Sequence, residues 1–386
     1  MSDWREPWRV ERARVHDAYD VHFGRAVDDL PTPSLLVDVE ILQRNLVTMA
    51  SALEGYPARL RPHTKVQKST DLAMLQMEAG AIGVTVATVW EAAAMAAAGI
   101  PDVLIANQVV GDDKLRSAAA LCRHTNLSLV VDDERNVAAL SQAALSAGVT
   151  MGILVDIDVG MARCGVRSSD QALSLARYVD TMAGLELRGV QAYEGHCMLE
   201  PDRETRIKLA REAMTYAVEI RQRLLDDGLS AQTLSAGGTG TYDITGHNPN
   251  LTELQAGSFV FMDAMHGNLV PGFEVSLTVL STVMARHGDT VILDAGRKSV
   301  GIDFVSPPIV NETWVARYFA EEHALFDTSS AYRADLGDHV QLIAGYAPTT
   351  INLHDVMFVH RSGVVSDIWP VFPRGPGHHG FQQLLT

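Results

Sequence analysis

Cysteine and positive charge are both scarce in this sequence of 386 residues. The three cysteines, Cys122, Cys164 and Cys197, are far apart and form no CxxC pair, a pattern typical of free thiols in a reducing compartment. The formal net charge of −16 argues against non-specific binding to nucleic acid or to an acidic membrane surface, since both need an excess of Lys and Arg. We therefore expect neither nucleic acid nor a membrane as a partner.

Long hydrophobic runs are lacking as well. An apolar stretch such as residues 82–100 contains Glu91 together with several glycines and alanines, so it does not predict a membrane span. Residues 1–17 are polar and charged, unlike a secretory signal. Together with the sparse cysteines, these features favour a cytoplasmic location.

Short β-branched runs alternate with Ala- and Leu-rich helical stretches between about residues 33 and 262. The runs are RLRPHT (59–64), IGVTVAT (82–88), VLIAN (103–107), LSLVVD (127–132), MGILVDID (151–158), LRGVQAYEGH (187–196), QTLSAGG (232–238) and ELQAGSFVFM (253–262). Eight strands alternating with helices predict an α/β fold, a (β/α)8 TIM barrel. A doubly wound open sheet is the alternative, but such a sheet usually has a glycine-rich turn after its first strand, which RPHTKVQKS lacks.

The character of the chain changes after about residue 266. The segments become β-rich and are separated by turn residues, with no long helical pattern. The first 30 residues have no barrel partner of their own. We therefore predict a barrel over residues 33–265 and a second, β-rich C-terminal domain formed by residues 1–32 and 266–386.

Lysine occurs only five times, which draws attention to Lys65 directly after the run RLRPHT. Catalytic residues of TIM barrels lie at the C-terminal ends of the strands. A lysine half-buried there has a depressed pKa and is neutral often enough to condense with an aldehyde. The alternative is a surface lysine at the start of a helix.

The segment SAGGTGTYD (235–243) follows the seventh predicted strand and places Gly237, Gly238 and Gly240 around Thr239. Such loops let backbone N–H groups converge on a phosphate, and barrels often bind phosphate after strands 7 and 8. The spacing matches neither GxGxxG nor GxxxxGK[ST], so a nucleotide is not indicated. A glycine-rich turn without a function is the alternative.

Two further strand ends carry candidate side chains. The segment DIDVGMARCGV (156–166) presents Arg163, which can reach a ring hydroxyl or a carboxylate of a ligand; a structural ion pair with a neighbouring aspartate is the alternative. The segment QAYEGH (191–196) places Tyr193 and His196 at the end of another strand, where each either faces a pocket or packs at the barrel rim.

Taken together, these segments resemble the D-threonine aldolase and D-serine dehydratase family, whose barrel is that of alanine racemase. The matching segments are TPSLLVD (32–38), RPHTKVQKS (61–69), ATVWEA (87–92), DIDVGMARCGV (156–166), VQAYEGH (190–196), SAGGTGTYD (235–243), ELQAGSFVFMDA (253–264), LDAGRKSVGID (293–303), EEH (321–323), PTTINLHD (348–355) and IWPVFPRG (368–375). They occur in order over nearly the whole chain, so the resemblance is specific for the family.

The resemblance implies pyridoxal 5'-phosphate as the cofactor, with Lys65 holding it as a Schiff base. It also implies that Gly238, Thr239 and Gly240 hold the phosphate, and that the enzyme is a homodimer. The residues that we expect to contact the cofactor, besides Lys65, are His63, Arg163, Tyr193, Gly238, Thr239, Gly240 and Ser258.

The sequence departs from the family at its metal site. In the family a divalent metal beside the cofactor is held by a His-x-Asp or His-x-Cys pair at the C-terminal motif. Here Tyr346 stands at the histidine position and Pro348 at the Asp or Cys position. Proline has no side-chain donor atom and neutral tyrosine is a poor ligand, so we expect this metal site to be lost. His378 and His379 are interpreted as part of a solvated tail rather than as ligands.

We therefore predict a lyase that acts on a small-molecule substrate, a β-hydroxy-D-amino acid. It is of the aldolase type and breaks the Cα–Cβ bond to give glycine, or an alanine-like amino acid, and an aldehyde. Without a metal, Tyr346, His196 or His266 would have to act as the acid or base. A dehydratase/ammonia-lyase or a racemase is the enzymatic alternative. A pyridoxal-phosphate homeostasis protein is the non-catalytic one, although such proteins usually end at the barrel.

Overall fold

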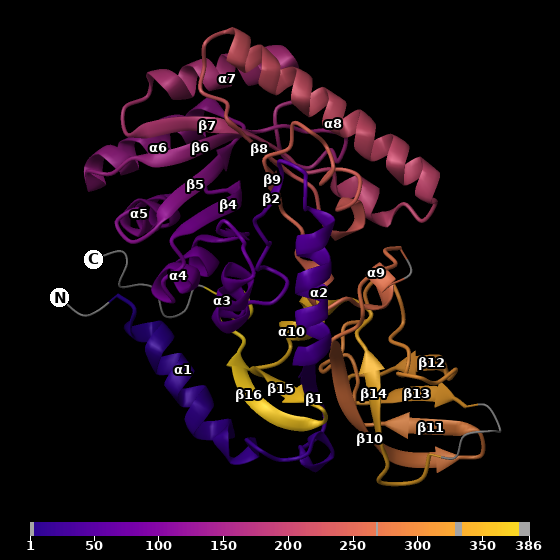
Figure 1. Ribbon diagram of the computed structural model, residues 1–386. Coiled ribbons are helices and arrows are strands. Elements are labelled where there is room, and N and C mark those ends of the chain that lie inside the picture. Colours follow the sequence, from indigo (N-terminus) through magenta and orange to yellow (C-terminus); the bar gives the residue numbers. More distant parts are fainter. Residues whose placement is uncertain (1–3, 268, 329–333, 378–386) are drawn as a thin grey trace.

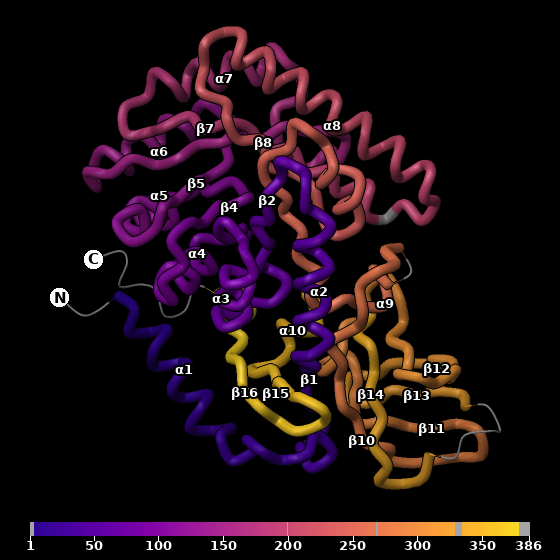
Figure 2. Tube along the Cα trace, in the orientation of Figure 1, coloured from indigo at the N-terminus to yellow at the C-terminus, as the bar shows by residue number. Residues whose placement is uncertain are grey.

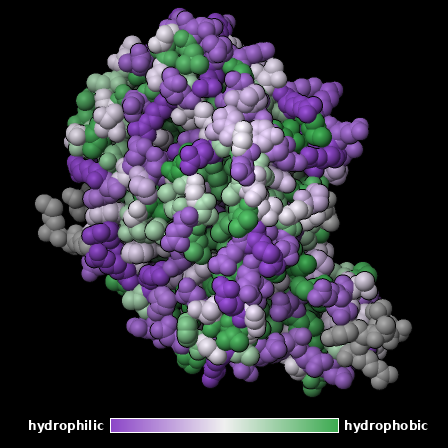
Figure 3. Space-filling view, in the orientation of Figure 1, coloured by the Kyte–Doolittle hydropathy of each residue, from purple (hydrophilic) through white to green (hydrophobic). Residues whose placement is uncertain are grey.

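The computed structural model describes residues 4–267, 269–328 and 334–377, so His378 and His379 lie outside the described residues. Figure 1 shows a barrel surrounded by helices above a second, strand-rich part, with helix α2 (Val39–Ala52) running between them. Among the described helices, none is long and apolar enough to cross a membrane. Hydrophilic residues cover most of the face in Figure 3, and apolar residues lie between them in small groups.

The first sheet consists of eight parallel strands in the order β2-β9-β8-β7-β6-β5-β4-β3. Their bounds are β2 (Arg59–Leu60), β3 (Val84–Val86), β4 (Asp102–Gln108), β5 (Asn126–Val131), β6 (Met151–Asp156), β7 (Leu185–Ala192), β8 (Thr233–Ala236) and β9 (Glu253–Leu254). A parallel bridge between His63 and Thr85 joins the two ends of this order. The Thr85 N–H donates to the Pro62 carbonyl at 2.9 Å and the Thr64 N–H to the Thr85 carbonyl at 2.8 Å, which closes the sheet. The predicted barrel is confirmed, and the open doubly wound sheet is wrong.

Helices follow most of the barrel strands and lie on the outside of the sheet, as Figure 2 shows. They are α3 (Thr70–Glu78), α4 (Val89–Ala97), α5 (Asp112–Leu121), α6 (Glu134–Ala147), α7 (Ser169–Thr181) and α8 (Arg203–Asp226). Polar caps define their starts: Thr88 and Glu91 form a capping box at α4, and the side chain of Ser168 accepts a backbone N–H at α7. Longer segments separate β2 from α3, β6 from α7 and β7 from α8, and these segments can carry side chains for a site at the strand ends.

The second sheet also has eight strands, in the order β12-β13-β11-β10-β1-β15-β16, with β14 paired to β10. Their bounds are β1 (Ser34–Asp38), β10 (Leu277–His287), β11 (Thr290–Leu293), β12 (Val315–Phe319), β13 (Ala324–Asp327), β14 (His339–Ile343), β15 (Val356–Arg361) and β16 (Val364–Pro370). Strand β1 pairs antiparallel with β10 and parallel with β15. The segment 34–38 therefore belongs to the second sheet, although the predicted boundary at residue 33 placed it with the barrel.

The N-terminal segment forms helix α1 (Glu6–Tyr19), which lies along β16 and against α3. The Trp8 indole donates to the Thr70 hydroxyl at 3.3 Å, and Arg12 pairs with Asp71 at 2.5 Å. The remaining short elements are η1 (Asp20–His22), η2 (Val27–Asp29), η3 (Gly195–Leu199), η4 (Thr239–Thr241), η5 (Ser258–Val260), α9 (Ala264–Gly267) and α10 (Ala347–Ile351). Helices α9 and α10 lie at the junction of the two parts (Figure 1).

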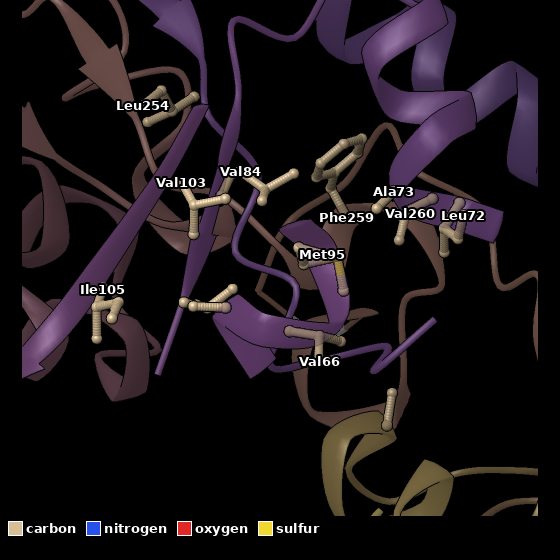
Figure 4. Close-up of a cluster of buried hydrophobic side chains, with 14 of the residues drawn as sticks. Val66, Leu72, Ala73, Val84, Met95, Val103, Ile105, Leu254, Phe259 and Val260 are labelled. Atoms are coloured by element: carbon tan, nitrogen blue, oxygen red, sulfur yellow. The ribbon is translucent and has the colours of Figure 1, made fainter. Parts of the chain in front are cut away.

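A single apolar cluster runs from the barrel into the second sheet, because it includes both Leu254 of β9 and Val279 of β10. Figure 4 shows its part near the first barrel strands, where Val66 and Phe259 lie with Val84 and Met95. Burial of apolar surface stabilises such a cluster by about 25 cal/mol per Å². The shared core fixes the second sheet against the C-terminal ends of the barrel strands, and the site lies there.

Candidate active site

A cavity of about 310 Å³ lies at the C-terminal ends of the barrel strands, a volume within the range of small-molecule sites. Its wall comes from segments that follow β2, β6, β7, β8 and β9, and from the α9 and α10 regions. The predicted site residues that line it are His63, Lys65, Arg163, Tyr193, Gly238, Thr239, Ser258, His266 and Tyr346. The cavity thus combines barrel residues with one residue, Tyr346, from beyond β14.

Lys65 lies in the wall of this cavity with its Nζ 5.8 Å from the ring centroid of Tyr193. The Arg163 guanidinium carbon is 5.7 Å from the same centroid. Burial, and then the charge of Arg163, lowers the pKa of Lys65 from 10.5 to about 8, against an opposing effect of Glu91. A lysine in this state has a substantial neutral fraction near neutral pH, as condensation with an aldehyde requires.

The second lysine of RPHTKVQKS has a different environment. The ammonium of Lys68 lies 3.5 Å from the buried carboxylate of Glu91 and donates to the Gly375 carbonyl at 2.9 Å. Glu91 itself accepts from the backbone N–H groups of Ala87 and Thr88. Lys68 therefore ties the C-terminal segment to α4, and Lys65 alone of the two faces the cavity.

His63 is a buried side chain whose Nδ1 has no hydrogen-bond partner among the described residues. Burial, and then the neighbouring Lys65, lowers its pKa well below the ordinary value, so the ring is neutral. Buried polar atoms are nearly always hydrogen-bonded, so an unpartnered one beside Lys65 indicates a place for a polar ligand group.

The glycine-rich loop begins where β8 ends. Gly237 has φ +84°, a conformation that other residues rarely adopt, and a Cβ there would collide with the side chain of Leu254. The Thr239 hydroxyl accepts from the Phe259 N–H at 3.0 Å, which joins this loop to η5 and brings Ser258 to the same wall. The two loops after the last two barrel strands therefore form one surface.

The buried carboxylate of Glu194 accepts hydrogen bonds from the glycine-rich loop and its neighbours. Glu194, with 0% exposure, accepts from the Gly237 N–H at 3.1 Å, from the Thr241 hydroxyl at 2.7 Å and from the Thr245 hydroxyl at 2.5 Å. Glu194 was not among the predicted site residues, although it follows Tyr193 in a matching segment. It lies after the end of β7, where the sequence gives no sign that a carboxylate is buried.

The floor of the cavity is polar. The Gln255 amide donates to the Gln191 side-chain oxygen at 3.0 Å, and the Gln191 amide donates to Asp156 at 2.9 Å. Asp156 also accepts from Gln108 at 2.9 Å, while burial raises its pKa. Gln191 and Gln255 line the cavity and were missed from the sequence, where they looked like ordinary strand residues.

His266 and Tyr346 face each other across the side of the cavity formed by α9 and α10. Their ring centroids are 6.3 Å apart with an angle of 16° between the planes. The His266 Nδ1 lies 2.8 Å from the Asp263 carboxylate. Both residues were predicted as acid or base candidates and both line the cavity, whereas Asp263 was not singled out.

Two predicted residues are not among those that line the cavity. His196 lies in η3 near Gly160, where a Cβ would be 3.0 Å from its ring, and Gly240 faces Met198 instead. The proposed acid or base role of His196 therefore has no support in the geometry. Arg163 lines the cavity rather than pairing with Asp158, which pairs with Arg167 at 3.5 Å.

Comparison with known proteins explains this arrangement. Residues 37–265 match the model of the alanine racemase N-terminal domain, and residues 276–360 match that of a putative serine dehydratase domain. A D-threonine aldolase from Arthrobacter sp. is 38% identical over 360 residues, which cover 91% of this chain and 95% of the relative. The chain belongs to the D-threonine aldolase and D-serine dehydratase family.

Other members of the family support this assignment. A 3-hydroxy-D-aspartate aldolase from Paracoccus denitrificans (strain Pd 1222) is 32% identical over 92% of this chain and 95% of its own length. The crystal structure of D-threonine aldolase from Filomicrobium marinum superimposes with a TM-score of 0.88 at 35% identity, covering 90% of this chain and 97% of that chain. The predicted fold, an alanine racemase-type barrel with a β-rich C-terminal domain, is therefore that of the family.

Proposed function

We propose that this chain is a pyridoxal-phosphate-dependent lyase of β-hydroxy-D-amino acids, of the aldolase type. The observation that carries the proposal is Lys65, a half-buried lysine with a pKa of about 8 inside the cavity of a chain that belongs to this family. The substrate is a small amino acid, as it is for the named relatives. Both domains contribute, since Tyr346 lies beyond the barrel.

The residues of the cavity fit the cofactor. Lys65 supplies the amine that holds its aldehyde carbon, and the two joined loops with Gly238, Thr239 and Ser258 supply donors for its phosphate. The unpartnered Nδ1 of His63 offers a polar contact next to Lys65. Among the remaining proposed contacts, Arg163 and Tyr193 also line the cavity, whereas Gly240 is not among the lining residues.

The chemistry divides between cofactor and protein. When bound, pyridoxal phosphate supplies the electron sink for the electron pair that remains on the substrate Cα. Lys65 would hold the cofactor, and Arg163 would provide a cation inside the cavity for a substrate carboxylate or a ring oxygen. His266 and Tyr346 line the same cavity and are the candidates for the base that would take the β-hydroxyl proton. Loss of that proton drives Cα–Cβ cleavage to an aldehyde and glycine.

The residues at the family's metal position do not fit a divalent metal. Pro348 lies in the first turn of α10 and has no side-chain donor atom. Burial, and then Asp263 and Asp303, raises the pKa of Tyr346, so its hydroxyl stays protonated and is a poor ligand. We propose that the enzyme works without the family's metal.

A dehydratase is the second candidate, because residues 276–360 match a putative serine dehydratase domain. Incubation with D- and L-β-hydroxy amino acids, with and without a chelator, separates the two. We expect an aldehyde and glycine from the D-isomer only, at a rate that the chelator leaves unchanged. Ammonia with a keto acid would identify a dehydratase, and activity on the L-isomer would contradict the D-stereochemistry.

Assembly and location stay predictions. The family resemblance supports a homodimer, which analytical ultracentrifugation would test; a monomer at micromolar concentration would contradict it. The three cysteines are free thiols, which supports the predicted cytoplasmic location.

A further inference from the structure

Asp263 and His266 form a buried pair at the edge of the cavity. The His266 Nδ1 lies 2.8 Å from Asp263 Oδ1, and the exposed fractions of the two residues are 6% and 0%. A carboxylate oxygen only accepts, so Nδ1 carries the hydrogen of this contact, and in the neutral ring Nε2 is the nitrogen with the lone pair. Since His266 lines the cavity, Nε2 is the ring nitrogen that is left to act on a ligand there.

The same carboxylate fixes both elements that meet at this edge. Asp263 Oδ1 also accepts from the His266 backbone N–H at 2.8 Å, and Oδ2 accepts from the Ala347 N–H at 2.9 Å. Ala347 follows Tyr346, so Asp263 sets the positions of the imidazole and of the phenol together. Phe304 packs edge-on against Tyr346 with ring centroids 5.2 Å apart, which further restricts the phenol.

Resting on the proposed function, we infer that the Asp263–His266 pair takes the place of the family's metal at the substrate β-hydroxyl. His266 Nε2 is the base, the neutral Tyr346 hydroxyl donates a hydrogen bond to the same oxygen, and Asp263 is a positioning residue. Two observations support this assignment. His266 and Tyr346 line the cavity together, and Tyr346 and Pro348 are unsuitable as metal donors.

The step balances without a metal or an oxidant. Nε2 takes the proton of the β-hydroxyl, the C–O bond becomes C=O, and the Cα–Cβ bond breaks. The electron pair of that bond stays with Cα, which later gains one proton to give glycine. The substrate is therefore converted to glycine and an aldehyde with no net change in protons.

The test compares His266→Ala with His247→Ala in the cofactor-loaded protein. His247 is a matched control because its Nε2 contacts the backbone carbonyl of Ala52, its ring stacks on Tyr56, and it is not among the described residues that line the cavity. We expect His266→Ala to keep the visible absorbance of the lysine-bound cofactor but to lose kcat on the order of 100-fold, and added imidazole to restore part of it. Asp263→Asn should lower kcat with little change in KM.

Two results would overturn the pair's role. The first is a His266→Ala protein that holds the cofactor and keeps the wild-type kcat. The second is a wild-type protein that binds Mn²⁺ in calorimetry and loses its activity when a chelator is added. If the wild type cleaves no β-hydroxy-D-amino acid, the proposed function itself fails.

A second variant keeps the inference testable if His266→Ala does not fold. Tyr346→His combined with Pro348→Asp restores the family's donor pair. We expect this double variant to bind Mn²⁺ in calorimetry with the metal alone, whereas the wild type does not, and its activity to become sensitive to chelator. Equal Mn²⁺ binding by both proteins would refute the substitution of the pair for the metal.

Discussion

The pH dependence of cofactor attachment tests the state of Lys65 directly. Its pKa of about 8, against 10.5 for an ordinary lysine, makes roughly one amine in ten neutral at pH 7, about 300 times the fraction of an unshifted lysine. As pH rises through about 8, Lys65 loses its proton and the reactive amine becomes the main form. The rate of attachment should therefore rise up to about pH 8 and level off well below pH 10.

The assay mixes cofactor-free protein with pyridoxal phosphate and follows the visible band of the attached cofactor over a range of pH. Lys65→Ala should give no band, whereas Lys68→Ala should keep it, because Lys68 is bound to Glu91 and Gly375. A rate that continues to climb to about pH 10 without levelling off would refute the argument.

The cause of the shift can be tested separately. Burial contributes most to the lowered pKa of Lys65, and the charge of Arg163 comes next. Arg163→Leu should therefore move the midpoint of the pH profile upward. Arg167→Leu is the matched control, since Arg167 pairs with Asp158 and is not among the residues that line the cavity. A midpoint that is the same in both variants would leave burial as the sole cause.

Three further changes test the scaffold of the site. Glu194→Ala leaves the Gly237 N–H and two threonine hydroxyls without their acceptor. It should weaken binding of pyridoxal phosphate about tenfold in a titration, while binding of pyridoxal, which lacks the phosphate, changes little. Equal losses of affinity for both ligands would contradict a role of Glu194 in the phosphate loop. Gly189→Ala would place a Cβ against the Thr233 carbonyl oxygen of the next strand, so it should markedly lower the midpoint temperature of thermal unfolding. An unchanged midpoint would show that β7 and β8 can move apart to make room for the Cβ. Phe259→Ala removes a fully buried side chain and should lower the free energy of unfolding, measured with denaturant, by about 3–5 kcal/mol. A decrease below about 1 kcal/mol would mean that the neighbouring loops fill the cavity that the substitution leaves.

The barrel was predictable because its strands are regular. Each predicted run overlaps an observed strand, from Arg59 in the first to Leu254 in the last, and the alternation with helices decided the fold class. The segment of β1 fell inside the predicted barrel domain, whereas β1 pairs with β10 and β15, because pairing partners distant in the chain leave no local pattern. Its residues Leu35, Leu36 and Val37 are all buried, as those of a barrel strand would be.

The site was predictable where a residue type is unusual and not where function depends on a contact. Lys65 was identified by the scarcity of lysine and by its place after a strand, and the glycine loop by its composition. The contact of Asp263 with His266 is local, over a spacing of three residues, but the hydrogen bond from the Ala347 N–H to Asp263 joins α9 to α10 and leaves no short pattern. His196 is not among the residues that line the cavity, because sequence spacing does not reveal the direction that a side chain takes after a strand ends.

The position of β1 has a consequence for how the chain folds as it is made. Ser34 pairs with Leu280 and Leu36 with Phe358, so the first strand to be synthesised waits for partners that come only after the whole barrel. Contacts so distant in sequence form slowly, and an unpaired apolar strand is exposed in the meantime. Removing the residues before Val39 would therefore not shorten an end of the protein. It would take out an interior strand of the second sheet and leave β10 and β15 without the neighbour that joins them.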